Sequence, residues 1–385
     1  MDTAFAKPRL RSLLDHFSVI EDPRESWRVA HPLPEILLLI VCGSICSCDD
    51  FDDIAAWGEA HLDFLRRFLP FHHGVPGARW LNMLMNRIDP ELFSDCFMAW
   101  ARETWPDTPA FIALDGKTSR RSHDHAAGRA PLHLVSAFAT AERLVLGQEA
   151  TDEKSNEITA IPALLERLGK AGRLAGATVT IDAIACNPKI AGEIVDHGAD
   201  YVLAVKGNQA SLHSEIESFF ATARPQDLDT FLDLDKAHGR IEQRAAAVST
   251  DITWLNGNRR FPGEYRFPKL AAIAMVEAKV ELKDRCHRER RYYIVSAPLR
   301  AERFAQAVRS HWCIENSLHW VLDVVFKDDL SRLRKGHGAQ NMAIVRHFAV
   351  NLVRQATDKL SLKTRRKKAG WSPDYLASLI QQSAR

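Results

Sequence analysis

Phe111-Ile112-Ala113-Leu114-Asp115 and Ala177-Thr178-Val179-Thr180-Ile181-Asp182 are the two stretches that decide the fold of this chain. Each is a short apolar run that ends in an aspartate, which predicts a buried strand with a carboxylate at its C-terminal end. Ligand-binding groups collect at the carboxyl ends of sheet strands, beside loops that admit a substrate. We therefore expect Asp115 and Asp182 to share a functional site.

A third acid, Glu315, lies inside a helical pattern that runs from Glu302 to Phe326. A single strand-end aspartate is usually a turn former, and a single helical glutamate is usually solvated. Three acids in the order strand, strand, helix indicate a common role. Carboxylate oxygens are the ligands that Mg²⁺ or Mn²⁺ prefers. The sequence thus predicts a site for two such ions and metal-assisted phosphodiester chemistry, with no further cofactor.

The elements around these acids predict an α/β fold. Strands are expected at 111–115, 132–140, 144–150, 177–182 and 201–205, with helices at 157–168 and 188–197. This β-β-β-α-β-α-β order is that of a ribonuclease-H-like mixed sheet, whose first and fourth strands lie side by side. That pairing would bring Asp115 and Asp182 together.

The rest of the chain divides around this core. Residues 1–105 have helical periodicity, and 106–357 form the core with a β-rich insertion at about 222–297. The insertion is expected to hold strands at 245–253, 270–280 and 292–296. Residues 358–385 are expected to form a basic tail with a short helix, whose run Arg365–Lys368 is solvated.

Composition excludes several classes of protein. The 385 residues are 46% hydrophobic and 26% charged, which is ordinary for a globular chain, and the net charge is only +2. A nucleic-acid partner would therefore need local basic patches. The seven cysteines are odd in number and irregularly spaced, which favours reduced thiols over disulfides or zinc. Neither a secretory leader nor a membrane span is evident, so we expect a cytoplasmic protein without membrane contact.

The helix around Glu315 carries further polar and aromatic residues. His311, Glu315 and His319 recur at four-residue spacing and share one face, so the histidines are expected near phosphate or behind the metal ligands. Asp323 on that face is a weaker fourth acid. We expect Trp312 and Trp320 to pack into the core, and Asp328 and Asp329 to form a solvated helix end.

Basic and polar side chains cluster in sequence near the three acids, and they suit contacts with the phosphate backbone of DNA. The residues expected to bind DNA are Lys117, Arg120, Arg121, Lys206, Asn208, Arg240, Lys283, Arg285, Arg288, His311, His319 and Arg332.

Several long motifs resemble those of the ISAs-type insertion-sequence transposases, a group that includes the H-repeat-associated proteins. They are Ile112–Thr118, Glu153–Pro162, Thr180–Ala183, Asp200–Leu203 with Lys206–Gln209, His238–Glu242 and His311–Trp320. The resemblance implies a DDE transposase with a ribonuclease-H-like core and a helical, DNA-binding N-terminal domain. It implies Asp115, Asp182 and Glu315 as the catalytic metal ligands.

The reaction that the resemblance implies is cleavage of double-stranded DNA at the inverted repeats of the element. The freed 3′-hydroxyl then attacks target DNA, and a homodimer would hold the two ends in a synaptic complex. Relatives carry Tyr, Arg and Lys around the catalytic Glu where this chain has Val308, His311 and Leu322. Two alternatives stay open: a catalytically silent DNA-binding remnant or repressor, and a ribonuclease-H-like nuclease that does not join strands.

Overall fold

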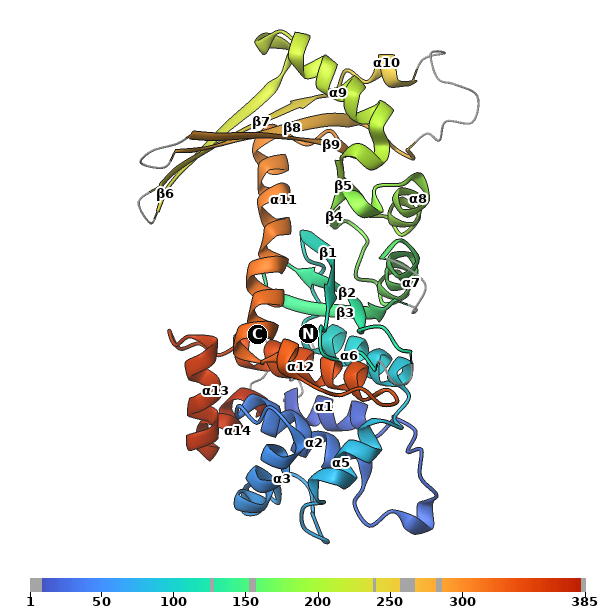
Figure 1. Cartoon of the computed structure of the whole chain (residues 1–385), viewed down its shortest axis with the longest axis vertical. Coiled ribbons are helices and arrows are strands. Elements are labelled where there is room, and N and C mark those ends of the chain that lie inside the picture. Colours follow the sequence, from blue (N-terminus) through green and yellow to red (C-terminus); the bar gives the residue numbers. More distant parts are fainter. Residues whose placement is uncertain are drawn as a thin grey trace, which may run out of the picture.

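The computed structural model of the chain is an elongated molecule with a helical base, a central sheet and an overhanging β-ribbon (Figure 1). It describes residues 9–124, 128–151, 157–237, 240–256, 267–281 and 286–381. Within these ranges no helix combines the length and the apolar character needed to cross a bilayer. All seven cysteines are free thiols, as expected.

The helical base is built from the N-terminal part of the chain. Its centre is α2, in which every residue except Pro34 is buried, because helices α1, α3, α12 and α13 surround it. Asp50 and Asp89 cap the helices that follow them by accepting hydrogen bonds from backbone N–H groups. The helices of the base are α1 (Arg9–Phe17), α2 (Leu33–Ile45), α3 (Phe51–Ala60), α4 (Leu62–Leu65), α5 (Ala78–Met85) and α6 (Pro90–Thr104).

The central sheet has the predicted ribonuclease-H-like topology. Its first five strands lie in the order β3-β2-β1-β4-β5. β1 pairs antiparallel with β2 and parallel with β4, and β4 pairs parallel with β5. The fold class is therefore confirmed. The strands are β1 (Phe111–Thr118), β2 (His133–Ala139), β3 (Leu144–Ala150), β4 (Thr178–Ile181) and β5 (Asp200–Val205).

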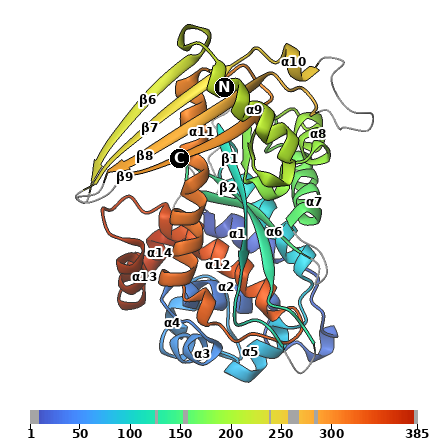
Figure 2. The ribbon, with the colours of Figure 1, turned by 45° about the horizontal axis from the view of Figure 1, so that its top comes forward.

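The β-rich insertion continues this sheet and does not form a separate one. β9 pairs antiparallel with β5, and the full order ends in β9-β8-β7-β6, a curved ribbon above the core (Figure 2). The prediction missed β6, whose acids Asp233 and Asp235 disfavour a strand but pair with Arg309. The strands are β6 (Asp229–Ala237), β7 (Arg240–Ser249), β8 (Ala272–Glu281) and β9 (Cys286–Val295).

Helices cover the sheet and join it to the base. α11 lies against β1, β4 and β5 and runs from the ribbon toward the base (Figure 1), while α12 packs on α2 and α6. After α11 the helix continues as two π-helical segments, Glu315–His319 and Val321–Val325, where a single α-helix was expected. The remaining helices are α7 (Glu157–Lys170), α8 (Pro188–Asp196), α9 (Ala210–Thr222), α10 (Thr253–Asn256), α11 (Ala301–Ile314) and α12 (Gly338–Arg354).

The C-terminal segment is not the solvated tail that the basic run predicted. It forms α13 (Leu362–Trp371) and α14 (Pro373–Gln381), which pack on α2 and α1. Arg365 and Arg366 are buried. Their guanidinium groups donate hydrogen bonds to backbone carbonyls, that of Arg365 to Val353 and that of Arg366 to Ser44. Buried arginines with satisfied donors tie this segment to the base. The domain boundaries at 105 and 357 stay a prediction.

Candidate active site

Asp115 and Asp182 stand next to each other because of the pairing of β1 with β4. Leu114 is in register with Ile181, so the next residue of each strand is the aspartate. β1 continues to Thr118 by pairing with β2 alone, so Asp115 lies within its strand and not at its end. The two carboxylates therefore meet at the point where β4 leaves the sheet.

Glu315 reaches the same place from the end of α11. Asp115, Asp182 and Glu315 all line one cavity of about 500 Å³, which is also walled by Lys206 and His311. The three acids are separated by up to 200 residues in sequence, and the packing of α11 across β1 and β4 brings them together. The structure thus places the predicted triad in one pocket.

Asp115 is surrounded by more negative than positive charge in this pocket. Burial, followed by the nearby carboxylate of Glu157 and those of Glu315 and Asp182, raises the pKa of Asp115 to about 7. The basic side chain beside it is the imidazole of His319, whose Nδ1 lies 3.5 Å from Asp115 Oδ2 and 3.0 Å from Glu315 Oε2. Excess negative charge with hard oxygen donors fits a divalent cation.

Asp182 has a different environment. Burial acts to raise its pKa, but the Ala183 backbone N–H and the Lys206 ammonium outweigh burial and lower it. Lys206 Nζ lies 3.1 Å from Asp182 Oδ1, and both side chains are half exposed. Asn208 donates to the Ala183 carbonyl and holds the loop that follows Asp182. Asp182 is therefore ionised and open to solvent.

Glu157 is a part of the site that the sequence reasoning did not single out. Its Oε1 lies 3.0 Å from His133 Nε2, and Gly116 makes room for both side chains because a Cβ there would collide with them. The available signals were the glycine directly after Asp115 and the position of Glu157 at the start of the helix after the third strand.

Comparison with known proteins identifies the family. The family description "Transposase DDE domain" matches residues 106–352, and "DDE_Tnp_1-associated" matches residues 14–101. The H repeat-associated putative transposase YhhI of Escherichia coli (strain K12) is 39% identical over 97% of this chain and 99% of its own length. This chain belongs to the DDE transposase family. The resemblance drawn from the sequence motifs is confirmed.

Further relatives of this transposase agree. The putative transposase YncI of Escherichia coli O157:H7 is 38% identical over 96% of this chain and 95% of that protein. A piggyBac transposase synaptic complex with hairpin DNA aligns over 96% of this chain and 80% of that chain, with a TM-score of 0.44 and 10% identity. A likeness that weak carries no argument, so the fold assignment rests on the strand order.

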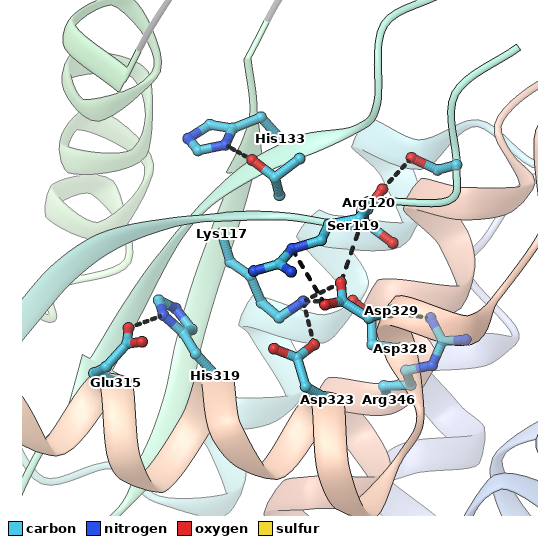
Figure 3. Close-up of polar contacts among 12 residues, drawn as sticks. Lys117, Ser119, Arg120, His133, Glu315, His319, Asp323, Asp328, Asp329 and Arg346 are labelled. Atoms are coloured by element: carbon cyan, nitrogen blue, oxygen red, sulfur yellow. Dashed lines mark hydrogen bonds and ion pairs between the residues drawn. The ribbon is translucent and has the colours of Figure 1, made fainter.

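We call Asp115, Glu315 and His319, which adjoin the predicted catalytic site, the catalytic cluster, and the group Asp323, Asp328 and Asp329 the lysine-centred cluster. Within each cluster the three side chains can offer ligand atoms that lie within 4.8 Å of one another. The second group surrounds Lys117, whose Nζ lies 2.7 Å from Asp323, 2.9 Å from Asp328 and 3.7 Å from Asp329 (Figure 3). The ammonium group of Lys117 thus occupies the position between these carboxylates that a metal ion would take.

Lys117, expected to contact phosphate, has its ammonium group engaged by three carboxylates, and its contact with DNA stays a prediction. Its side chain is 11% exposed, and Asp328 is also buried, with Arg346 Nη1 2.5 Å from its Oδ1. The expectation that Asp328 ends a helix in solvent is wrong for the same reason: a buried carboxylate is retained by two cations. Lys117 fastens β1 to the segment that follows Glu315.

The two histidines, expected near phosphate or behind the metal ligands, differ in exposure: His311 is half-buried in the cavity wall, and His319 is buried. His311 Nδ1 lies 3.1 Å from Thr180 Oγ1, and burial lowers the pKa of both His311 and His319. Trp312 and Trp320, expected in the core, are 47% and 56% exposed. The expectation that the two tryptophans pack into the core is wrong, whereas the role of the two histidines at the site stays a prediction.

The other residues expected to bind DNA have mixed environments. Arg120, Arg121 and Arg332 are exposed, and Arg120 also pairs with Asp329. Arg288 is exposed and pairs with Glu277 on β8. Lys283 and Arg285 lie outside the described residues, as does the side chain of Arg240. Their contacts with DNA stay a prediction.

Proposed function

We propose that this transposase is catalytically active, cleaving DNA at the inverted repeats of its element and transferring the 3′-hydroxyl to target DNA. The observation that carries the proposal is the convergence of Asp115, Asp182 and Glu315 in one cavity. A remnant that only bound DNA would not need three carboxylates gathered in a pocket where burial, and after it the nearby carboxylates, raise the pKa of Asp115.

The three acids would hold two Mg²⁺ or Mn²⁺ ions. Bound there, the ions would supply activation of an oxygen nucleophile and neutralisation of charge on the phosphate. Asp115 follows the last β1–β4 pair, Asp182 directly follows β4, and Glu315 directly follows α11, so three elements would each contribute one carboxylate to the ions. Asp182 is ionised and half exposed, which leaves its oxygens accessible from the cavity.

Residues around the cavity would position the DNA. Lys206, Arg290 and Arg291 line it together with the half-exposed Trp312, and Arg291 lies 4.7 Å from the centre of the Trp312 ring. Lys206 also pairs with Asp182, so it would turn to phosphate once a cation replaces it there. Cationic side chains beside an aromatic ring suit a distorted or unpaired strand near the cleavage point.

Double-stranded DNA is the proposed partner, both as element ends and as target. Exposed Arg120, Arg121 and Arg332 extend the basic surface beyond the cavity. Two ends must be held together for insertion, so we propose a homodimer in the synaptic complex.

The test is metal-dependent cleavage of DNA that carries the inverted repeats flanking the gene. Asp115→Asn, Asp182→Asn and Glu315→Gln should each abolish cleavage and strand transfer, since each removes a metal ligand. Glu302→Gln is the matched control, because Glu302 is an exposed acid at the start of the same helix. Circular dichroism and thermal unfolding check that each variant is folded.

The outcomes separate the candidate functions. Cleavage and joining by the wild-type chain, both lost in the three variants, support the proposal. Cleavage without joining would favour a nuclease, and end-specific binding without cleavage would favour a repressor. Full activity in any one of the three variants would refute the assignment of that residue.

A further inference from the structure

His319 is the one member of the catalytic cluster that is not a carboxylate. Its side chain is 5% exposed, and its Nδ1 lies 3.0 Å from Glu315 Oε2 (Figure 3). The same Nδ1 lies 3.5 Å from Asp115 Oδ2. Its Nε2 is buried without a hydrogen-bond partner in the described part of the chain. Nδ1 is therefore the ring atom through which His319 acts on the site.

The spacing of these three atoms matches the ligand shell of a single ion. Neighbouring ligands about 2.1 Å from an ion are separated by about 3.0 Å in an octahedral shell and about 3.4 Å in a tetrahedral one. The distances from His319 Nδ1 to the two carboxylate oxygens, 3.0 Å and 3.5 Å, lie close to these two values. Glu315 and His319 are also the first and last residues of a π-helical segment, a distortion that often accompanies functional sites.

The second histidine of this helical stretch, His311, lines the cavity and is placed differently. His311 Nδ1 faces the hydroxyl of Thr180 on β4, at 3.1 Å, and forms no ion pair with a described carboxylate. The two histidines lie on the same helix eight residues apart, so they form a natural pair of test and control. Only His319 directs a ring nitrogen between two of the proposed metal ligands.

We propose that His319 Nδ1 is a direct metal ligand, so that the ion shared with Asp115 and Glu315 has a mixed oxygen–nitrogen shell. The inference rests on the proposed function, which assigns the carboxylates as metal ligands. The second ion, on the side of Asp182, would have oxygen ligands from the protein. The two positions are therefore chemically unequal.

Ion preference follows from this asymmetry. Mg²⁺ strongly prefers oxygen ligands, whereas imidazole suits transition ions. The position that contains His319 should consequently select Mn²⁺ over Mg²⁺, and exchange of the imidazole for a carboxylate should remove that preference.

The decisive experiment is electron spin-echo spectroscopy of Mn²⁺ added to the full chain. A directly bound imidazole gives a nitrogen coupling on the Mn²⁺ signal that carboxylates and water do not give. The coupling should be present in the wild type, absent in His319→Gln and retained in His311→Gln. Persistence of the coupling in His319→Gln, or its loss in His311→Gln alone, would overturn the proposal.

The same samples separate this proposal from the proposed function. One outcome is that the wild type binds Mn²⁺ without a nitrogen coupling and that Asp115→Asn loses this binding. That outcome would refute His319 as a ligand and would still support the proposed carboxylate site. Failure of the wild type to bind Mn²⁺ would refute both. Thermal unfolding without metal shows whether each variant is folded.

Equilibrium titration adds a second readout that does not depend on activity. His319→Gln should weaken Mn²⁺ binding by at least the roughly 10-fold that even an outer-shell change produces. His319→Asp should bind Mg²⁺ and Mn²⁺ with more similar affinity than the wild type. Equal ratios of the two affinities in wild type and His319→Asp would contradict the mixed shell.

Discussion

The catalytic cluster and the lysine-centred cluster are neighbours with similar spacing between their ligand atoms. They differ in whether cationic side chains of the protein neutralise their carboxylates. Both bring potential ligand atoms within 4.8 Å of one another, and both connect β1 to the segment after α11. Lys117 occupies the centre of the lysine-centred cluster, with Arg346 behind it. The catalytic cluster has only His319 as a described ion-pair partner for Asp115 and Glu315.

The charge states follow this difference. Burial acts to raise the pKa of Asp328, but Arg346 and Lys117 outweigh burial and lower it. Burial and the surrounding carboxylates raise the pKa of Asp115 to about 7. A cluster that the protein neutralises with its own cation stabilises the fold, whereas a cluster without such a cation can bind one from solution. Acidic spacing alone does not distinguish the two.

Removal of the central lysine should have the largest effect on stability. Lys117→Met would leave Asp328 and Asp323 without the ammonium that they contact, and loss of one partner of a buried ion pair destabilises by about 3–5 kcal/mol. Urea unfolding followed by circular dichroism measures the change. The control Lys170→Met removes an exposed pair with Glu166 and should leave stability nearly unchanged.

Equal effects of these two substitutions would show that the lysine-centred cluster is no stronger than a surface pair. Lys117→Met should also weaken divalent-metal binding at the catalytic cluster, because Lys117 fastens the segment that follows Glu315. Unchanged metal affinity would show that the two clusters are independent.

Neutralisation of Asp115 should stabilise the metal-free protein above neutral pH. The folded pKa of about 7 exceeds the ordinary value of 3.8, so the folded state keeps a proton that the unfolded chain has lost. The stability of the wild type should therefore fall as pH rises between these values, by up to about 4 kcal/mol. Asp115→Asn should lack this slope in urea unfolding at a series of pH values with a chelator present.

Asp182→Asn should give the opposite sign. The pKa of Asp182 is lowered, so its ionised form stabilises the fold above the ordinary aspartate pKa, and that contribution disappears as pH falls. A stabilising Asp182→Asn at neutral pH would contradict the ion pair with Lys206.

Divalent metal should stabilise the protein through one cluster only. At a concentration 100 times the dissociation constant, Mn²⁺ should add about 2.7 kcal/mol, measured as a shift in thermal unfolding. Asp115→Asn should abolish the shift, and Asp329→Asn in the lysine-centred cluster should retain it. Loss of the shift in Asp329→Asn would mean that the ammonium of Lys117 does not exclude metal.

Among the substitutions at the proposed site, Lys206→Met should have the smallest effect on stability. Its pair with Asp182 is half exposed, so Lys206→Met should change the free energy of unfolding by less than about 1 kcal/mol. The same variant should reduce the salt dependence of DNA binding by about one phosphate contact. An unchanged salt slope would show that Lys206 does not turn from Asp182 to DNA.

Local patterns were enough to predict the core strands and the pocket. The apolar runs that end in Asp115 and Asp182 predicted the correct strands, and the predicted strand order placed these two strands side by side. β6 was missed because its exposed leucines and inward acids invert the usual alternation, with Leu232 and Leu234 more than half exposed. The helical face of Glu315 was found, but not the burial of His319.

The sequence by itself determined which carboxylates are carried by which strands and helix, because backbone periodicity is a local property. Only the tertiary structure decided which acids receive a cation from the protein, because Lys117 and Asp328 are 211 residues apart and meet through the packing of distant elements. Charge compensation depends on distances in space, and those distances leave Asp115 and Glu315 to be neutralised from outside.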